Sequence, residues 1–416
     1  MTQDFFDALE TRDASEREAQ LMAALPAQVA HAQRATSAYA QILAGVDAAA
    51  VKSRAALAQL PVTRKSELLE RQQAQRASDP FGGFSALVRG PAMPRVYASP
   101  GPIYEPEGST RDYWRVGRAM FAAGFRSGEL VHNAFSYHMT PGAFIMESGA
   151  HAVGCTVFPA GVGQTEQQLQ AVAELRPVAY AGTPSFLRIL VDKAQETGSD
   201  ISSLRKGLVG GEAFPPSLRD WFLERGLDIY QSYATADLGL IAYETTAREG
   251  MVVDEGVIVE IVRPGTGDPV APGEVGEVVV TTLNPAYPLI RFGTGDLSAV
   301  LPGADPTGRT NMRIRGWLGR ADQTTKIRGM FVHPGQVADV ARRFPEIVKA
   351  RLVVTGEMAN DVMTLQVEAE SPPQGLDARI GEAVRDVTKL RADVHLVRPG
   401  TLPNDGKVIE DARSYK

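Results

Sequence analysis

The chain has 416 residues, of which 44% are hydrophobic and 22% are charged, and its formal net charge is −6. A chain of this length is too long for one simple core, so one large and one small domain are expected. The negative net charge, without a dominating basic patch, argues against a nucleic-acid or anionic-membrane partner.

The cysteine content is one residue, Cys155, which excludes a disulfide framework and a cysteine zinc cluster and fits a reducing compartment. Its flanks, Val153-Gly154 and Thr156-Val157-Phe158, are typical of a buried strand, so a structural thiol is favoured over a reactive one. The sequence has no visible secretory signal and no window of about 20 uninterrupted apolar residues. A cytoplasmic protein without a membrane span is expected.

The N-terminal part has a helical pattern, with Leu21, Leu25 and Val29 at helical spacing. The segment 60–66 (LPVTRKS) then predicts a turn, with Ser66 capping a short helix at 67–72. Between residues 96 and 233, strand-like runs alternate with helical patterns, which indicates a layered α/β domain with much parallel sheet. Strands are expected at 130–137, 154–159, 178–182, 207–210 and 227–233, and helices at 113–125, 142–152, 166–175, 184–194 and 216–225.

The pattern changes after Glu249, where short strands follow one another with Pro-Gly turns and without helices. This predicts an antiparallel β subdomain over about 250–318 within a large domain of residues 1–318. Residues 319–416 then predict a compact α+β module. The expected strands of the subdomain are 257–263, 276–282, 291–300 and 312–317.

Three glycine-and-charge signatures follow in a fixed order: Gly293-Thr294-Gly295-Asp296, then 319–329 (GRADQTTKIRG), then Asn404-Asp405-Gly406-Lys407. One such motif alone is weak, because a hairpin turn with a solvated aspartate has the same residues. The ordered set resembles the adenylate-forming superfamily of acyl-CoA synthetases, peptide-synthetase adenylation domains and luciferases. The resemblance implies an α/β fold, with a large multi-layer N-terminal domain and a small mobile C-terminal domain. It also implies an enzyme that activates a carboxylate with ATP and passes the acyl group to a thiol.

The physical chemistry of these residues can be set beside the roles that the resemblance implies. Glycines on both sides of Thr294 allow a sharp turn that points Asp296 outward, where a carboxylate can accept both ribose hydroxyls. In the family, the position of Arg320 contacts the nucleotide, and the position of Asp322 is the hinge between the adenylating and thioester-forming states. The following Lys326, Arg328 and Gly329 would line the CoA path; the simpler interpretation is an exposed basic hairpin.

The lysine of the third signature, Lys407, is the first candidate for catalysis, together with Arg320. A compact ammonium on a mobile loop suits the stabilisation of charge when a carboxylate attacks a phosphate. In relatives with a matching Gly-Lys, this lysine serves the adenylation half-reaction. A lysine near a chain end is otherwise usually solvated, so its place after the other two signatures supports the assignment.

Upstream, residues 209–215 (VGGEAFP) resemble the adenine-pocket turn of the family, with Gly211 allowing close approach of the base and Glu212 serving the pocket. Tyr233 matches the aromatic residue near the adenine. Asp237 stands where a glutamate normally helps to hold Mg²⁺, and Glu244 is a second metal candidate. The usual phosphate-contacting threonine is replaced by Ala236.

The phosphate-gripping loop of the family is expected at Ser99–Ser109, but this segment departs from the family pattern. Its three prolines donate no amide, the family lysine is absent, and Glu105 and Glu107 would repel a triphosphate. Either phosphate is held mainly by Mg²⁺, Lys407 and Arg320, or efficient ATP use has been lost.

Within the superfamily, the chain looks most like phenylacetate–CoA ligase and its short relatives, as in the segments 60–65, 136–138, 149–155 and 183–185. Two candidate residues of the acyl pocket, His138 and His151, could equally be buried structural histidines. Some relatives hold a structural zinc through cysteines, which one cysteine cannot do, and homodimers are common. The resemblance implies an acyl pocket whose candidate wall residues are Phe135, Tyr137, His138, His151 and Tyr180.

The leading hypothesis is therefore an ATP-dependent ligase of CoA with a carboxylic acid, an aryl acid by resemblance, that uses Mg²⁺ and forms an acyl-AMP intermediate. A close alternative loads a carrier-protein thiol. A third hypothesis is a nucleotide- or acyl-binding protein without turnover, which the segment Ser99–Ser109 and Ala236 favour.

Overall fold

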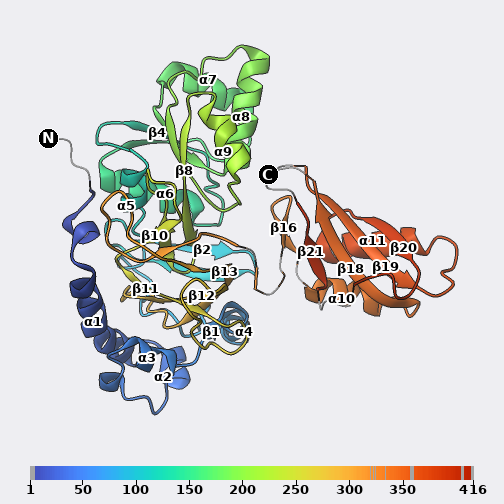
Figure 1. Ribbon diagram of the computed structural model, residues 1–416, viewed down its shortest axis with the longest axis horizontal. Coiled ribbons are helices and arrows are strands. Elements are labelled where there is room, and N and C mark those ends of the chain that lie inside the picture. Colours follow the sequence, from blue (N-terminus) through green and yellow to red (C-terminus); the bar gives the residue numbers. More distant parts are fainter. Residues whose placement is uncertain are drawn as a thin grey trace. The chain divides into compact units, whose positions relative to one another are not determined.

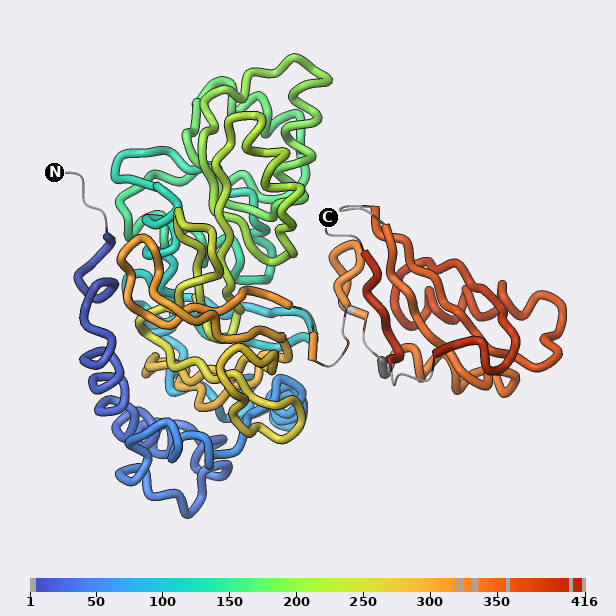
Figure 2. Tube along the Cα trace, viewed as in Figure 1, coloured from blue at the N-terminus to red at the C-terminus, as the bar shows by residue number. Residues whose placement is uncertain are grey.

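The computed structural model describes residues 5–318, 320–321, 323, 325–332, 334–356, 360–403 and 407–413. Contacts divide the chain into two compact units, whose chain paths are drawn in Figures 1 and 2. Unit 1 comprises Met1–Phe214 and Leu218–Leu318, and unit 2 comprises Pro215–Ser217 and Gly319–Lys416. The architecture is mixed α/β, as the sequence predicted.

The helices at the start of unit 1 pack through one apolar face. Leu21, Leu25 and Val29, at helical spacing, are all buried in the core, and the Asp13 carboxylate caps the first long helix through Ser15 N at 2.8 Å. A later helix begins at Lys65, earlier than predicted, so Ser66 lies in its first turn and is not the cap. These elements are η1 (Ala8–Thr11), α1 (Ala14–Ala35), α2 (Ser37–Ile42), η2 (Ala48–Ala50), α3 (Arg54–Ala58) and α4 (Lys65–Gln75).

The larger sheet of unit 1 has nine strands among the described residues, in the order β14-β15-β10-β9-β8-β7-β6-β4-β5. Its β5, β4, β6, β7 and β8 are parallel and alternate with helices along the chain, as the βαβ pattern predicted. The parallel part comprises β4 (Leu130–Asn133), β5 (Thr156–Pro159), β6 (Ala179–Gly182), β7 (Lys206–Val209) and β8 (Asp228–Thr235). The helices are α5 (Gly117–Ala122), α6 (Gly142–Val153), α7 (Thr165–Leu175), α8 (Pro184–Thr197) and α9 (Pro216–Leu223).

The strands after residue 238 contribute to two sheets instead of one antiparallel subdomain. One set continues the larger sheet in antiparallel pairing: β9 (Gly239–Tyr243), β10 (Met251–Val253), β14 (Val300–Leu301) and β15 (Arg313–Ile314). The other set forms a sheet of order β1-β13-β12-β11, comprising β1 (Thr63–Arg64), β11 (Val257–Val262), β12 (Gly276–Thr282) and β13 (Phe292–Ser298). β1 pairs with β13 in parallel, which brings the segment before α4 beside the Gly293–Asp296 signature.

The segment that holds the expected phosphate loop begins as a two-stranded hairpin, β2 (Arg95–Ser99) and β3 (Ile103–Glu107). The strands are antiparallel in register from Arg95–Glu107 to Ser99–Ile103. Residues 100–102 form the turn between them. We call Arg95–Glu107 the hairpin.

Unit 2 is a small α+β body. Its main sheet has the order β20-β19-β18-β21, in which β21 adds the C-terminal segment in parallel beside β18. The buried apolar face of the amphipathic α11, with Leu376, Ile380 and Val384, joins the core of this sheet. The elements are β16 (Thr325–Ile327), β17 (Met330–Val332), α10 (Pro334–Arg342), β18 (Ile347–Thr355), β19 (Val362–Ala369), α11 (Leu376–Thr388), β20 (Asp393–Val397) and β21 (Ile409–Asp411).

A helix that spans a bilayer needs about 20 consecutive, mostly apolar residues. Within the described ranges, none is both long and apolar enough to cross a membrane.

Candidate active site

The first signature lies in β13 of unit 1, where Asp296 is half-buried. Gly295 has φ +73°, a conformation that favours glycine. The Thr294 hydroxyl donates to the Val278 carbonyl at 2.9 Å and accepts from the Asp296 amide at 3.1 Å. The hydrogen bonds of the Thr294 hydroxyl therefore fix the backbone that carries Asp296.

The Asp296 carboxylate receives a hydrogen bond on each oxygen. The Tyr233 hydroxyl, at the end of β8, donates to Oδ2 at 2.9 Å, and Trp317 Nε1 donates to Oδ1 at 3.1 Å. The structure thus brings together two residues that the sequence placed near adenine and ribose separately. Trp317, which is 41% exposed, was missed; the sequence signal that could have found it is a tryptophan just before the expected domain junction.

The predicted adenine turn follows β7, at the edge where the parallel strands end. Gly211 has φ +77°, and a Cβ built there would lie 3.6 Å from the Phe135 ring. The Glu212 carboxylate accepts from the Ser185 hydroxyl, at the start of α8, at 2.5 Å. Ligands of open α/β sheets bind at this edge, so the turn, Tyr233 and Asp296 lie where a nucleotide is expected.

The two metal candidates have different surroundings. Asp237 is buried; its Oδ2 pairs with Lys65 Nζ at 2.8 Å, and its Oδ1 has no partner among the described residues. The Glu244 carboxylate pairs with the Arg219 guanidinium at 2.6 Å. Both carboxylates are thus paired with a cationic side chain, and they differ in their second oxygen. A hard cation prefers oxygen donors, so the unpaired Oδ1 of Asp237 fits Mg²⁺, whereas both oxygens of Glu244 already accept hydrogen bonds within the protein.

The two glutamates of the hairpin are not exposed charges, contrary to the expectation that they would repel a triphosphate. Glu107 accepts from the Tyr97 hydroxyl at 2.6 Å and pairs with Arg95 at 3.1 Å. Glu105 is 1% exposed, and burial together with the charge of Asp237 raises its pKa to about 8. The tertiary structure thus compensates or buries both charges.

The predicted acyl-pocket residues differ in how far they are buried. Tyr180 is fully buried in β6, and its hydroxyl donates to the Thr183 carbonyl at 3.2 Å. Tyr137 donates to Glu147 at 2.7 Å. His138 and His151 are exposed, so neither lies in an enclosed wall, and the alternative of buried structural histidines is also wrong for them.

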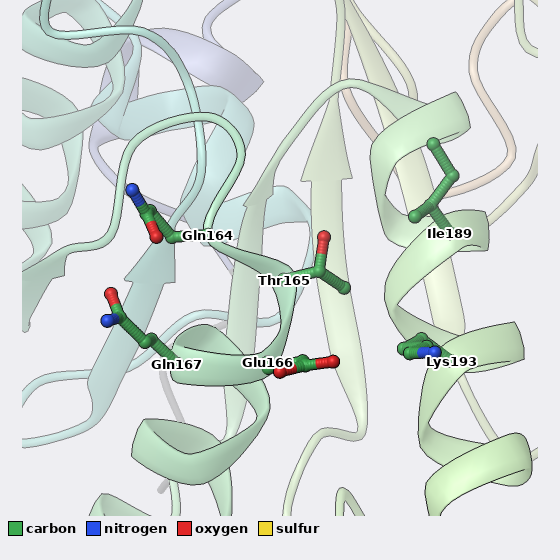
Figure 3. A pocket seen from close by; sticks show the side chains of 6 residues that line it. All are labelled: Gln164, Thr165, Glu166, Gln167, Ile189 and Lys193. Atoms are coloured by element: carbon green, nitrogen blue, oxygen red, sulfur yellow. The ribbon is translucent and has the colours of Figure 1, made fainter.

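A surface hollow lies between the start of α7 and the middle of α8 in unit 1 (Figure 3). It contains none of the predicted site residues. Its side chains are mostly polar, and Lys193 pairs with Glu196 of the same helix at 3.2 Å. The lining residues are Gln164, Thr165, Glu166, Gln167, Ile189 and Lys193.

In unit 2, the C-terminal segment is tied to the region of the second signature. Gln323 Oε1 accepts from the Val408 amide at 2.8 Å, and Arg351 Nη1 donates to the Lys407 carbonyl at 3.4 Å. Lys407 itself is exposed, and Arg320 is half-buried. The predicted hinge, Asp322, lies outside the described residues.

The predicted CoA-path residues lie in β16 and in the turn between β16 and β17. Lys326 lies in β16, and Arg328 and Gly329 follow with φ values of +47° and +82°. The Arg328 guanidinium donates to the Asp361 carbonyl at 2.8 Å. The turn is thus fixed, within unit 2, to the residue that precedes β19.

Comparison with known proteins now identifies the family. Residues 117–286 match the model of the AMP-binding enzyme family, and residues 329–412 match that of the AMP-binding enzyme C-terminal domain. The chain is 31% identical over 397 residues to a phenylacetate-coenzyme A ligase of Thermus thermophilus, covering 86% of this chain and 87% of that protein. It is 32% identical over 380 residues to a phenylacetate-coenzyme A ligase of Aromatoleum evansii, covering 85% and 84%.

The chain belongs to the phenylacetate–coenzyme A ligase family. It is thus an enzyme of the AMP-forming acid–thiol ligase class. The fold agrees: the structure of a 2-hydroxyisobutyryl-CoA ligase in complex with 2-HIB-AMP and CoA superimposes with a TM-score of 0.81 at 24% identity, covering 98% of this chain and 92% of that one. The superfamily resemblance seen in the sequence, and the subclass, are confirmed.

Proposed function

We propose that this member of the phenylacetate–coenzyme A ligase family joins an aryl carboxylic acid to CoA, with ATP as the source of energy. The observation that carries the proposal is the pair formed by Tyr233 and Asp296, from β8 and β13, at 2.9 Å. It supports a nucleotide site at the edge of the larger sheet, next to the turn at Gly211. The family favours an aromatic acid, and the Phe135 ring beside Gly211 is a suitable wall for one.

In the proposed first step, the substrate carboxylate attacks the α-phosphate of ATP, pyrophosphate leaves, and acyl-AMP forms. Asp296 would accept the ribose hydroxyls, and Gly211 and Glu212 would border the adenine. Lys407 would stabilise the charge that develops between carboxylate and phosphate, and Arg320 would contact the nucleotide. Mg²⁺, when bound at Asp237, would offset the triphosphate charge.

In the proposed second step, the CoA thiolate attacks the acyl carbon of acyl-AMP, and AMP leaves. In the family, the small domain rotates between the two steps. The rotation moves the adenylating lysine out of the site and opens a path for the thiol. We assign the hinge to Asp322 and the path to Lys326, Arg328 and Gly329. A cytoplasmic location and a homodimer are further predictions that the family supports.

A second candidate is a protein that binds nucleotide or acyl groups without turnover. The observation that favours it is the hairpin, where a Ser/Thr/Gly-rich loop with a lysine is usual in the superfamily. The retention of Asp296, Arg320 and Lys407 favours the ligase, because a binding protein has no need of the C-terminal lysine. Transfer to a carrier-protein thiol is a third candidate and differs from the first only in the acceptor.

The experiment that tests the proposal measures pyrophosphate and AMP release from ATP and Mg²⁺ with a panel of aromatic and short aliphatic acids. Each acid is offered with CoA, with an acyl carrier protein in its phosphopantetheine form, and without a thiol. Acid-dependent pyrophosphate release, with AMP release that requires CoA, supports the ligase. Nucleotide binding without any turnover across the panel would instead support the binding protein.

A further inference from the structure

Gln323 contacts the backbone beside both candidate catalytic residues of unit 2. Its amide donates to the Arg320 carbonyl at 3.4 Å. Its side-chain Oε1 accepts from the Val408 amide at 2.8 Å and from the Ile409 amide at 3.3 Å, and Val408 directly follows Lys407. The first contact is made by the backbone and the second by the side chain, so a substitution that keeps the backbone removes only the second.

The backbone of Gln323 has a conformation that a glutamine seldom adopts. Its φ is +60°, in a region where asparagine, aspartate and histidine are enriched among the non-glycine residues. An asparagine would suit this backbone better, but its side chain is one methylene shorter. The contact with residues 408 and 409, and not the backbone, therefore accounts for a glutamine at this position.

A buried arginine fixes the same segment from the side of the sheet. Arg351 is 3% exposed, donates from Nη1 to the Lys407 carbonyl at 3.4 Å and pairs with Glu410 at 2.7 Å. The Leu352 amide donates to the Val408 carbonyl at 2.9 Å, where β21 begins to pair with β18. Lys407 thus directly precedes a strand whose first residues are held by the sheet and by Gln323.

A second anchor holds the chain before the third signature. Lys349 on β18 and Glu368 on β19 are paired across the two strands. Glu368 Oε1 accepts from the Leu402 amide at 2.6 Å, and Lys349 Nζ donates to the Pro403 carbonyl at 2.7 Å. The chain is therefore fixed within unit 2 both at 402–403 and at 407–409, which limits the positions that Lys407 can take.

We propose that Gln323 is a positioning residue for Lys407, which it fixes to the first residue after the hinge through the amides of residues 408 and 409. The inference rests on the proposed function, which gives Lys407 its role in adenylation and Asp322 its role as the hinge. A misplacement of about 1 Å can lower a catalytic rate about a hundredfold. Because Lys407 serves only the first step, loss of this contact should slow adenylation and spare the thioester step.

The experiment compares three substitutions of Gln323 with one control, all in the full chain. Gln323→Met keeps the length of the side chain and removes the acceptor oxygen. Gln323→Asn keeps the amide group and suits the backbone, but it is too short to reach Val408. Gln323→Glu keeps an acceptor oxygen at full length. The control is Gln336→Met, because Gln336 of α10 also bonds to a backbone group of unit 2, the Val387 carbonyl of α11, at 3.2 Å.

The first measurement follows the two half-reactions separately. Adenylation is measured as acid-dependent pyrophosphate release, with the acid of the panel that gives the highest rate. The thioester step is measured as CoA-dependent AMP release from the acyl-AMP of the same acid, prepared by chemical synthesis. Gln323→Met and Gln323→Asn should lower the adenylation rate about tenfold or more and leave the thioester step unchanged. Gln323→Glu and Gln336→Met should keep both rates.

An equal loss in both half-reactions would indicate a general disturbance of the fold or of the hinge, and it would overturn the proposal. An unchanged adenylation rate in Gln323→Met or in Gln323→Asn would overturn it as well. Thermal unfolding of each variant identifies any that fails to fold, and Gln323→Asn then replaces Gln323→Met.

The second measurement needs no substrate. Amide hydrogen exchange, followed by mass spectrometry on a peptide that contains residues 408 and 409, reports whether Gln323 protects these amides. Exchange should be about fivefold faster in Gln323→Met and Gln323→Asn than in the unchanged chain, in Gln323→Glu and in Gln336→Met. Equal exchange in all of these proteins would overturn the proposal.

The two measurements distinguish a failure of this proposal from a failure of the proposed function. Faster exchange in Gln323→Met, without acid-dependent pyrophosphate release by the unchanged chain, would confirm that Gln323 fixes the segment after Lys407 and would refute the ligase. Pyrophosphate release at the same rate in Gln323→Met and in the unchanged chain would support the ligase and refute the positioning role.

Discussion

Arg64 donates hydrogen bonds to both carboxylate oxygens of Glu277, an ion pair that links the start of α4 to β12. Glu277 Oε1 also accepts from the Gly295 amide at 3.2 Å. The pair passes so close to β13 that a Cβ on Gly293 would lie 2.8 Å from Glu277 Oε1 and 3.0 Å from Arg64 Nη1. A side chain at position 293 would therefore displace the ends of these two side chains, and the ion pair supports the backbone that presents Asp296.

The first prediction concerns this ion pair. Arg64→Met should lower the free energy of unfolding by on the order of 3 kcal/mol, because it leaves the charge of Glu277, 1% exposed, buried without its partner. Adding Glu277→Gln to Arg64→Met should recover part of the loss. Urea unfolding measures both. Arg176→Met, which removes an exposed pair with Asp200, serves as the control with a change near zero.

The second prediction concerns the hydroxyl of Tyr233. Tyr233→Phe removes a hydrogen bond to the charged Asp296, which is worth on the order of 1.5 kcal/mol, so AMP should bind about tenfold more weakly by calorimetry. Tyr230→Phe is the matched control, since Tyr230 lies on the same strand and its hydroxyl donates to Asp228 at 2.9 Å. Equal AMP affinities in Tyr233→Phe and the unchanged chain would remove Tyr233 from the nucleotide site.

The third prediction separates catalysis from binding. Lys407→Ala should abolish acyl-AMP formation, measured as acid-dependent pyrophosphate release, while ATP still binds. The reason is that the ammonium is proposed to stabilise charge during attack on the phosphate. Lys389→Ala, which changes another lysine of unit 2, should leave the rate unchanged, because its ammonium pairs with Asp386 on the surface of α11. Normal adenylation by Lys407→Ala would refute the proposed mechanism.

The fourth prediction concerns pH and the buried His132. Its Nε2 contacts Gln168 Oε1 at 2.8 Å, its Nδ1 has no partner among the described residues, and burial lowers its pKa. The unfolded chain takes up a proton near pH 6.5 and the folded protein only at lower pH, so the unfolded state binds more protons in this window. Stability is therefore full above about pH 6.5 and falls below it.

The size of this effect is at most about 1.4 kcal/mol per pH unit from one group. Urea unfolding between pH 8 and 5 measures it. His132→Gln should flatten the decrease below pH 6.5, whereas His138→Gln, at an exposed position, should not. Parallel pH profiles for His132→Gln and the unchanged chain would contradict the prediction.

The fifth prediction concerns Cys155, whose thiol donates to the Arg126 carbonyl at 3.2 Å. Burial raises its pKa to about 11, so little thiolate exists at pH 8 and the thiol should react slowly with Ellman's reagent. The reaction should become fast in urea. Rapid reaction of the native protein would contradict the interpretation of Cys155 as a structural thiol.

The sequence was sufficient for features that depend on local pattern. The alternation of strands and helices between residues 130 and 233 predicted the parallel β4–β8 with their helices, because period and turn residues are local properties. The buried stripe of Leu21, Leu25 and Val29 followed in the same way. The ordered signatures also led to the family, since motif order is read directly from the chain.

The tertiary structure decided which distant residues meet. Lys65 pairs with Asp237, Arg64 with Glu277, and Trp317 with Asp296. No local periodicity encodes such partners, because they come from different elements that the sheets bring together. The same reason explains Glu105 and Glu107, which were expected from the sequence to repel a triphosphate and are buried or paired in the fold. The sequence by itself determined the family and the elements. Packing between elements decided which charged side chains of the site are paired or buried, and how its residues are arranged.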